Sequence, residues 1–125
     1  MVLGAAGGIR IPSAIVQVIS RVIDRGMSLE TAIAAPRVHP MSTIDEQNVR
    51  HVHLRGMEVD RTAKGWSRRV IRKWRSARFD VDEIREEGRF GRVYAVAARG
   101  SRLDGYADPD GEGAGSKSVT CRSVE

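Results

Sequence analysis

Residues 1–26 read MVLGAAGGIRIPSAIVQVISRVIDRG and contain a short apolar run, a glycine-rich segment and an amphipathic segment. Val2 and Leu3, followed by the segment from Gly4 to Gly8, predict a strand that enters a tight loop, because glycine permits positive φ angles and close backbone approach. Residues 12–25 then carry apolar side chains at three- and four-residue spacing, with Pro12 in the first turn. We therefore expect a strand, a loop and a mostly buried helix.

The loop from Gly4 to Gly8 is a candidate functional site. Backbone N–H groups at the start of a helix can bind an anion or a developing oxyanion. The loop does not match a dinucleotide fingerprint, which needs glycine where the chain has Ala6, or a P-loop, which needs lysine where it has Ile9. The alternative is a purely structural role as a strained turn.

The rest of the chain mixes helices and strands and holds no internal repeat. The residue patterns predict a short helix that Ser28 caps and that ends before Pro36. They predict irregular or extended structure over 37–60, with Val49, Val52 and Leu54 as candidates for a strand, and then a helix that Asp60 caps and that runs to about Ala77. They further predict strands near 79–81, 92–97 and 103–107, and a turn over 108–111.

Composition limits the possible classes of protein. The chain has 125 residues, 41% of them hydrophobic, and a formal charge of +5, which suits one domain with one core. A single cysteine, Cys121, excludes a disulfide within the chain, and without a nearby histidine we expect it to be an inert surface thiol. Residues 11–23 are interrupted by polar side chains, so no membrane span is expected, and residues 1–4 lack the features of a signal peptide. The composition does not indicate in which cellular compartment the protein resides.

A run of cations between residues 61 and 78 is the second candidate site. Trp66 and Trp74 lie within this run, and they could stack on bases while the cations bind phosphates. In the alternative, both tryptophans share an apolar face with Val70, and the acidic segment 80–87 neutralises the cations. The cations are Arg61, Lys64, Arg68, Arg69, Arg72, Lys73, Arg75 and Arg78.

Histidines form the third candidate. In a strand, His51 and His53 would share a face. Other potential metal ligands nearby in the sequence are His39, Asp45 and Glu46. Their spacing matches no established ligand pattern, so we expect no metal site here and interpret these residues as solvated polar groups.

Several segments together resemble the small subunit of gamma-glutamyltransferases, also called gamma-glutamyltranspeptidases. GAAGGIRI (4–11) stands where the family usually has GSPGGSRI, and APRVH (35–39) where it has APRFH. The helix between them ends near an Asp and a Gly, as in the family. GRVYAV (91–96) and LDGYADP (103–109) are similar to the closing strands, which end in GASDPR. The resemblance covers residues 1–115, and we expect 116–125 to be a flexible tail.

This resemblance implies an α+β fold, as part of the αββα sandwich of the N-terminal-nucleophile hydrolases. In that family the N-terminal threonine of the small subunit attacks the γ-glutamyl carbonyl, assisted by its own α-amine. The resulting acyl-enzyme passes the γ-glutamyl group to water or to an acceptor amine. Two adjacent glycines donate backbone N–H groups to the oxyanion, and these correspond to Gly7 and Gly8 here. The resemblance implies no cofactor and no metal.

The sequence departs from the family pattern at several positions. Ala5, Ala6 and Ile9 replace the usual Ser, Pro and Ser, so the loop lacks a stiffening proline and two hydroxyl groups. Asp110 stands where the family commonly has arginine. The nucleophilic threonine and the groups that bind the glutamyl α-carboxylate and α-amine lie upstream of the glycine loop in the family. None of the chain's threonines matches the nucleophile motif: Thr31, Thr43, Thr62 and Thr120.

We therefore expect the chain to be the C-terminal part of a gamma-glutamyltransferase small subunit, to contribute the oxyanion loop, and to be inactive alone. Its expected partner is the missing N-terminal part or large subunit of the same enzyme, and its expected substrate is a γ-glutamyl compound such as glutathione. The alternative is a small basic module that binds nucleic acid or another polyanion.

Overall fold

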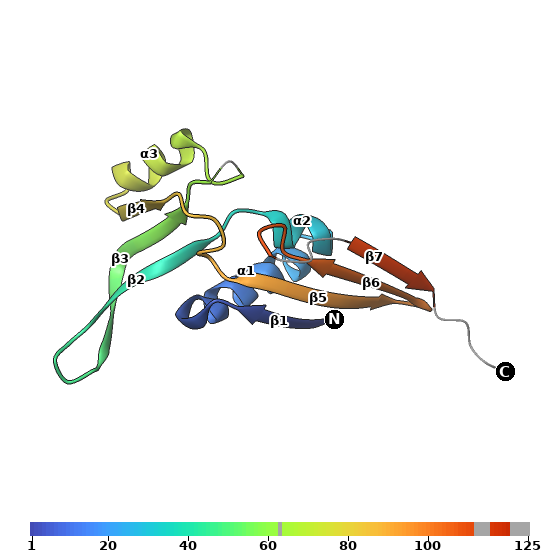
Figure 1. Ribbon diagram of the computed structural model, residues 1–125. Helices are drawn as coiled ribbons and strands as arrows, with labels where there is room; N and C mark the ends of the chain where they lie inside the picture. The colour runs from blue at the N-terminus through green and yellow to red at the C-terminus, as the bar shows by residue number, and fades with distance from the viewer. Residues whose placement is uncertain (63, 112–115, 121–125) are drawn as a thin grey trace. The chain divides into compact units, whose positions relative to one another are not determined.

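The computed structural model describes residues 1–62, 64–111 and 116–120, and the chain divides into two compact units (Figure 1). Unit 1 consists of Met1–Ala35 and Gly91–Glu125, and unit 2 of Pro36–Phe90. Each unit has a sheet and a hydrophobic core of its own. Within the described residues, no helix is both long enough and apolar enough to cross a membrane.

Unit 1 is built on a four-stranded antiparallel sheet with the strand order β1-β5-β6-β7. The strands are β1 (Val2–Ala6), β5 (Arg92–Arg99), β6 (Arg102–Ala107) and β7 (Ser116–Thr120). Gly4 pairs with Tyr94, and Val96 pairs with both Val2 and Gly105. The N-terminal strand is thus hydrogen-bonded to a strand about 90 residues later in the chain, as the alignment of these two ribbons in Figure 1 shows.

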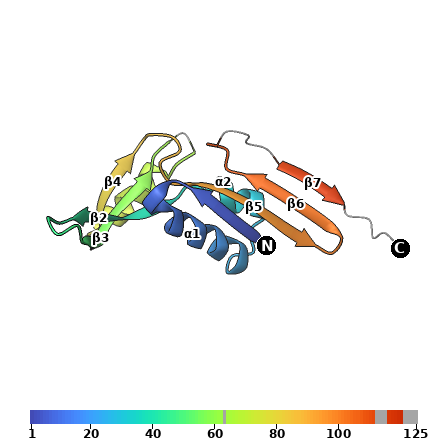
Figure 2. The ribbon, with the colours of Figure 1, turned by 60° about the horizontal axis from the view of Figure 1, so that its bottom comes forward.

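Two helices pack on one face of this sheet. The 3-10 helix η1 (Gly8–Arg10) leads into α1 (Ile11–Ile23), which packs on β1 and β5, and α2 (Leu29–Ala34) packs on β5 and β6 (Figure 2). Pro12 lies in the first turn of α1, and the Ser28 hydroxyl caps α2 by accepting a hydrogen bond from the Thr31 N–H at 3.2 Å. The predicted helices are confirmed. The buried core between helices and sheet comprises Ala14, Val18, Leu29, Ala32, Ile33, Val93 and Ala95.

The opposite face of the unit 1 sheet is also apolar. Because side chains alternate along a strand, Val2, Tyr94 and Val96 point away from the helices, and Val2 is 74% exposed and Val96 46% exposed. A shallow groove crosses this face over β1, β5 and β6. Unit 1 therefore has one apolar face that its own helices cover and one that they do not.

Unit 2 is a three-stranded sheet of β2 (Val38–Ile44), β3 (Arg50–Asp60) and β4 (Asp80–Ile84) in that order. β2 and β3 form an antiparallel hairpin with an irregularity between Pro40 and Ser42, and β4 pairs parallel to β3. A parallel neighbour requires a crossover connection, and α3 (Arg68–Ser76) provides it. The core consists of Val59, Ile71 and Val81, with Val38, Met57, Trp66, Trp74 and Phe79 packed around them.

The helix that Asp60 is predicted to cap is capped by Ser67 instead, seven residues later. Asp60 ends β3, and its carboxylate accepts hydrogen bonds from the N–H and the hydroxyl of Thr62 at 2.9 and 2.8 Å. The chain then turns so tightly that a Cβ on Gly65 would lie 2.4 Å from the carbonyl oxygen of Asp60. The helix begins after Ser67, whose hydroxyl accepts a hydrogen bond from the Val70 N–H.

Other predicted boundaries also differ from the structure. Gly4 belongs to β1, so the glycine loop is limited to Gly7 and Gly8. Residues 37–60, for which irregular or extended structure is predicted, form the two strands β2 and β3. Residues 116–120, which the sequence predicts to be part of a flexible tail, pair with β6 as β7 (Ser116–Thr120). Cys121 and the remainder of that segment lie outside the described residues.

Candidate functional site

Gly7 and Gly8 form the junction between the first strand and the first helix. β1 ends at Ala6, the φ angle is 134° at Gly7 and 60° at Gly8, and η1 and α1 follow directly. Both glycines are exposed. In the described part of the chain, neither of their N–H groups donates a hydrogen bond, while the Gly7 carbonyl accepts one from the Arg10 N–H. Two unpartnered donors at the N-terminal end of a helix can bind an anion.

Packing explains why residue 7 is glycine. A Cβ on Gly7 would lie 2.7 Å from the Cα and 3.3 Å from the backbone nitrogen of Gly91, the residue before β5. Gly91 itself has a φ angle of +77°, and its own Cβ would lie 3.2 Å from the Cβ of Ala14. Two backbone segments from distant parts of the chain therefore approach closely at this point, and only glycine fits on both sides.

Gly8 is glycine for a different reason. Its φ angle of +60° is costly for other residues, yet a Cβ there would meet no atom within 4 Å. The backbone at Gly8 faces open space, so a bound group can approach it. The two predicted site residues are therefore glycine for different reasons. Packing against Gly91 requires glycine at residue 7, whereas the positive φ angle favours glycine at residue 8, which faces open space.

Asp108 holds the chain after β6 against β5. It is buried, and one carboxylate oxygen accepts a hydrogen bond from the Val93 N–H at 3.2 Å while the other accepts one from the Asp110 N–H at 3.1 Å. Val93 lies in the core beside α1. The Asp-Pro dipeptide that contributed to the family resemblance therefore has a structural role in this unit.

The threonine hydroxyls have local partners where the structure describes them. The Thr31 hydroxyl lies 2.7 Å from the Ser28 hydroxyl, and the Thr62 hydroxyl donates a hydrogen bond to the Asp60 carboxylate at 2.8 Å. The hydroxyl of Thr43 lies 3.3 Å from His53 Nε2 on the exposed hairpin. Thr120 ends β7. None of these positions identifies a nucleophile.

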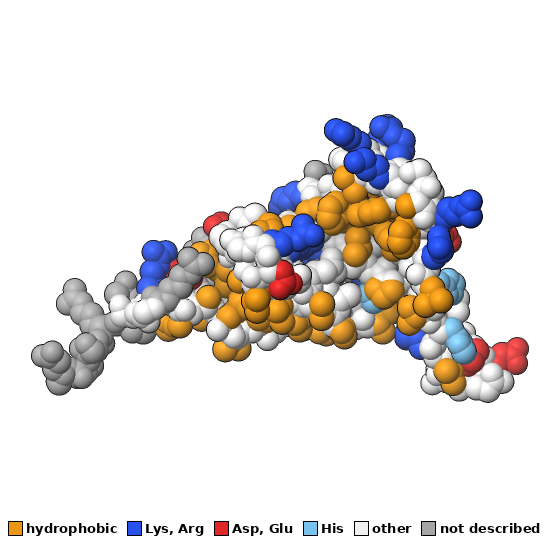
Figure 3. Space-filling view, turned by 180° about the vertical axis from the view of Figure 1, so that it is seen from behind, with side chains coloured by type: hydrophobic (Ala, Val, Ile, Leu, Met, Phe, Trp, Pro, Cys, Tyr) orange, Lys and Arg blue, Asp and Glu red, His pale blue; other side chains and the backbone are white. Residues whose placement is uncertain are grey.

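Two of the three histidines, His51 and His53, lie on the exposed part of β3, and His39 lies in β2. His51 Nε2 lies 2.6 Å from Asp45 Oδ2 near the tip of the β2–β3 hairpin, whereas His39 is buried. The hydrogen bond from His51 is the main cause that lowers the pKa of Asp45 below its usual value. Figure 3 shows histidine and acidic side chains gathered at the hairpin tip. Among the described residues, no three histidine, cysteine, aspartate or glutamate side chains come together as a metal site.

The tryptophans of the basic segment belong to the core of unit 2. Their ring centroids are 5.1 Å apart in a T-shaped arrangement, and Trp66 Nε1 donates a hydrogen bond to the Arg37 carbonyl at 3.0 Å. Both rings pack against the buried cluster that contains Ile71. Both rings are half-buried and engaged in this packing, which confirms the interpretation of these residues as core.

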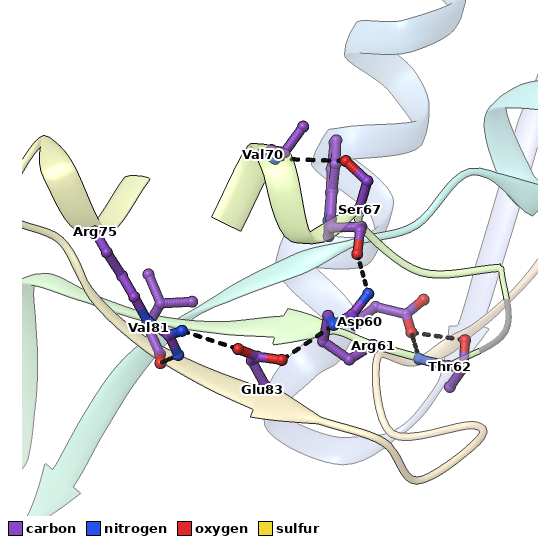
Figure 4. Close-up of polar contacts among 9 residues, drawn as sticks. Asp60, Arg61, Thr62, Ser67, Val70, Arg75, Val81 and Glu83 are labelled. Atoms are coloured by element: carbon purple, nitrogen blue, oxygen red, sulfur yellow. Dashed lines mark hydrogen bonds and ion pairs between the residues drawn. The ribbon is translucent and has the colours of Figure 1, made fainter. Parts of the chain in front are cut away.

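Glu83 is the acidic partner of the basic segment. Its two carboxylate oxygens lie 3.1 Å from Arg61 Nε and 3.0 Å from Arg75 Nη1, as Figure 4 shows. Arg61 also donates to the Trp66 carbonyl, and Arg75 to the Val81 carbonyl at 3.0 Å. The Arg61 hydrogen bond is the main cause that lowers the pKa of Glu83 below its usual value. One carboxylate thus binds two of the eight cations.

Comparison with known proteins identifies the class of fold and then the family. The mixed helices and sheets match N-terminal-nucleophile hydrolase structures, which confirms the predicted fold class. The family model for gamma-glutamyltranspeptidase matches residues 1–118. The chain therefore belongs to the gamma-glutamyltranspeptidase family. A sequence search of curated proteins finds no match.

Three solved structures illustrate the similarity. Gamma-glutamyltranspeptidase from Pseudomonas nitroreducens, complexed with L-DON, is 28% identical with a TM-score of 0.70, and the match covers 90% of this chain and 52% of that one. A mutant of the Helicobacter pylori enzyme is 25% identical with a TM-score of 0.64, covering 87% and 53%. Cephalosporin acylase from Bacillus halodurans, 15% identical with a TM-score of 0.63, covers 98% and 20% and shares the fold. The chain thus spans about half the length of the gamma-glutamyltranspeptidase chains it matches.

Proposed function

We propose that this chain supplies the oxyanion-binding loop of an enzyme that transfers a γ-glutamyl group to water or to an acceptor amine through an acyl-enzyme. Family membership supports the reaction class. The observation that carries the assignment of the loop is the pair of exposed glycine N–H groups without acceptors among the described residues, at the N-terminal end of the helical segment.

The chemistry requires donors that are already in place when charge develops. Attack on the γ-glutamyl carbonyl produces a tetrahedral intermediate whose oxygen carries a negative charge, and the N–H groups of Gly7 and Gly8 would donate to it. A single oxyanion donor is worth about 3 kcal/mol of the activation barrier. The open space beside Gly8 suits this role, because a side chain there would obstruct the reacting carbonyl.

The nucleophilic threonine in this proposal comes from outside the 125 residues. The hydroxyls of Thr31, Thr43 and Thr62 have local partners and lie in no nucleophile motif. The chain matches about half of the related chains, which leaves room for a further segment. In the complete enzyme, that segment or the large subunit is the partner. The uncovered apolar sheet face around Val2 and Val96 is a suitable surface for it, since burial of apolar area stabilises association.

The proposed substrate is a γ-glutamyl amide such as glutathione, and the proposed mechanism uses no metal and no cofactor. The test compares two proteins in a chromogenic γ-glutamyl anilide assay. The isolated chain is expected to show no turnover, and turnover would refute the external nucleophile. A chimera of the Pseudomonas nitroreducens enzyme, in which this chain replaces the matched half, is expected to be active. An inactive chimera that is folded and correctly assembled would contradict the proposal.

A further inference from the structure

A second candidate site lies in unit 2, on residues that the proposed reaction does not use. A hollow of about 260 Å³ opens between α3 and β4. Its floor includes Ile71, which is 2% exposed and belongs to the core. Its walls are charged and comprise Arg68, Arg72, Arg75, Glu83 and Arg85.

The positive charge of this hollow is not neutralised within the described residues. The one acidic group, Glu83, is bound to Arg75 and to Arg61, which lies outside the hollow. Arg68, Arg72 and Arg85 have no acidic partner in the part of the chain that the structure describes. Arginines that line one hollow repel one another, and a bound anion offsets that repulsion.

The geometry places these arginines on one side of the helix. Arg68, Arg72 and Arg75 follow each other at four- and three-residue spacing on α3, so they share a face, and Arg85 follows the end of β4. Figure 3 shows Lys and Arg side chains gathered around the end of unit 2 that carries α3. Guanidinium groups form paired hydrogen bonds with phosphate and carboxylate oxygens, and several of them around one hollow favour a compact anion with several charges.

The geometry points to a binding site for a compact multivalent phosphate group, such as a chain of two or three linked phosphates, in the hollow formed by Arg68, Arg72, Arg75 and Arg85. The site recognises charge rather than bases, because Trp66 and Trp74 pack against the core of unit 2 and neither of them lines the hollow. The buried Ile71 at the floor of the hollow adds no polar side-chain group that would compete for the anion.

The test measures binding of tripolyphosphate, orthophosphate and sulfate to the full chain by titration calorimetry at constant ionic strength. Tripolyphosphate is expected to bind at least about tenfold more tightly than either small anion. The double variant Arg68→Gln/Arg72→Gln is expected to weaken tripolyphosphate binding about a hundredfold, about tenfold for each lost arginine. The matched control Arg69→Gln/Lys73→Gln removes the same charge from the same helix outside the hollow, and is expected to change affinity less than about threefold.

Each of the other possible results contradicts the proposed binding site. Equal weakening by the two double variants would mean that the whole helix attracts anions without a defined site. Absence of tripolyphosphate binding to a chain with native circular dichroism would also refute it. Duplex DNA that binds more tightly than tripolyphosphate, and is lost equally in both variants, would identify an extended basic face instead.

Discussion

A Cβ atom on Gly7 would lie 2.7 Å from the Cα of Gly91, although the two residues are 84 positions apart in the chain. This contact joins the end of β1 to the start of β5. We therefore predict that Gly7→Ala destabilises unit 1 by about 2–4 kcal/mol, because alanine must both adopt a φ of +134° and displace backbone atoms. Urea unfolding followed by far-UV circular dichroism measures this effect.

Gly100→Ala is the matched control for that substitution. Gly100 also has a positive φ, of +59°, but a Cβ there meets nothing within 4 Å. It should cost only the backbone strain, about 1–2 kcal/mol. Equal destabilisation by the two variants would show that the approach of Gly91 does not constrain residue 7.

Asp108→Ala should destabilise unit 1 by about 1–3 kcal/mol, because it leaves the N–H of Val93, a core residue, without its acceptor. Asp110→Ala is the control, since Asp110 contributes its backbone N–H rather than its side chain to the same turn. Thermal unfolding of the two variants distinguishes them. A melting temperature of the Asp108 variant equal to that of the control would contradict the role of the carboxylate.

Ile71→Ala should destabilise unit 2 by about 2–5 kcal/mol, because Ile71 is almost fully buried between Val59 and Val81. Both tryptophans of the chain lie in unit 2, so tryptophan fluorescence during urea unfolding reports on this unit. Val52→Ala, at a β3 residue that is 57% exposed, should change the midpoint by less than the equivalent of about 0.5 kcal/mol. A fluorescence midpoint unchanged by Ile71→Ala would refute this core.

The stability of unit 2 should depend on pH through Glu83. Arg61 and Arg75 lower the pKa of Glu83 in the folded state, so the ionised carboxylate stabilises the fold above the usual glutamate pKa of about 4.3. This contribution is lost as the pH falls through the lowered pKa. Between about pH 7 and about pH 3, the Glu83→Gln variant should therefore lose less stability than the natural chain. In Glu86→Gln, which removes only an exposed pair with Arg89, the loss should match that of the natural chain.

The elements that the sequence predicted well are those specified by local pattern. Both helices of unit 1 carry their own signals, since Pro12 starts one and Ser28 caps the other. The predicted start of α3 is wrong. Aspartate is a common helix cap, but the Asp60 carboxylate accepts hydrogen bonds from Thr62 at the end of β3. The strands of unit 2 were weakly predicted, since β3 is mostly exposed and lacks a clear alternation.

The candidate site is also only partly predictable, because some of its features depend on residue type and others on contacts between residues far apart in the chain. Glycine permits the positive φ that Gly7 and Gly8 adopt, so the sequence predicts a tight loop at these residues. The sequence does not predict the role of Gly91, because that role depends on a contact with a residue far away in the chain. The family resemblance includes Asp108, whereas its hydrogen bond with the Val93 N–H depends on the pairing of β5 with β6, which the sequence does not predict.

The most direct test of the central claim compares Gly8→Ala with Gly26→Ala in the chimera described above. Both glycines lie in unit 1, with φ angles of +60° and +63°, and a Cβ at either position meets nothing within 4 Å. Their cost in stability should therefore be similar, and only the activity separates them. Alanine keeps the backbone N–H, but its Cβ would occupy the open space beside Gly8, where the reacting carbonyl must approach to accept that N–H. Gly8→Ala should therefore prevent the contact with the oxyanion and lower kcat about 100-fold to 1,000-fold, while Gly26→Ala leaves it nearly unchanged. Equal kcat values for the two variants would contradict the assignment of the loop.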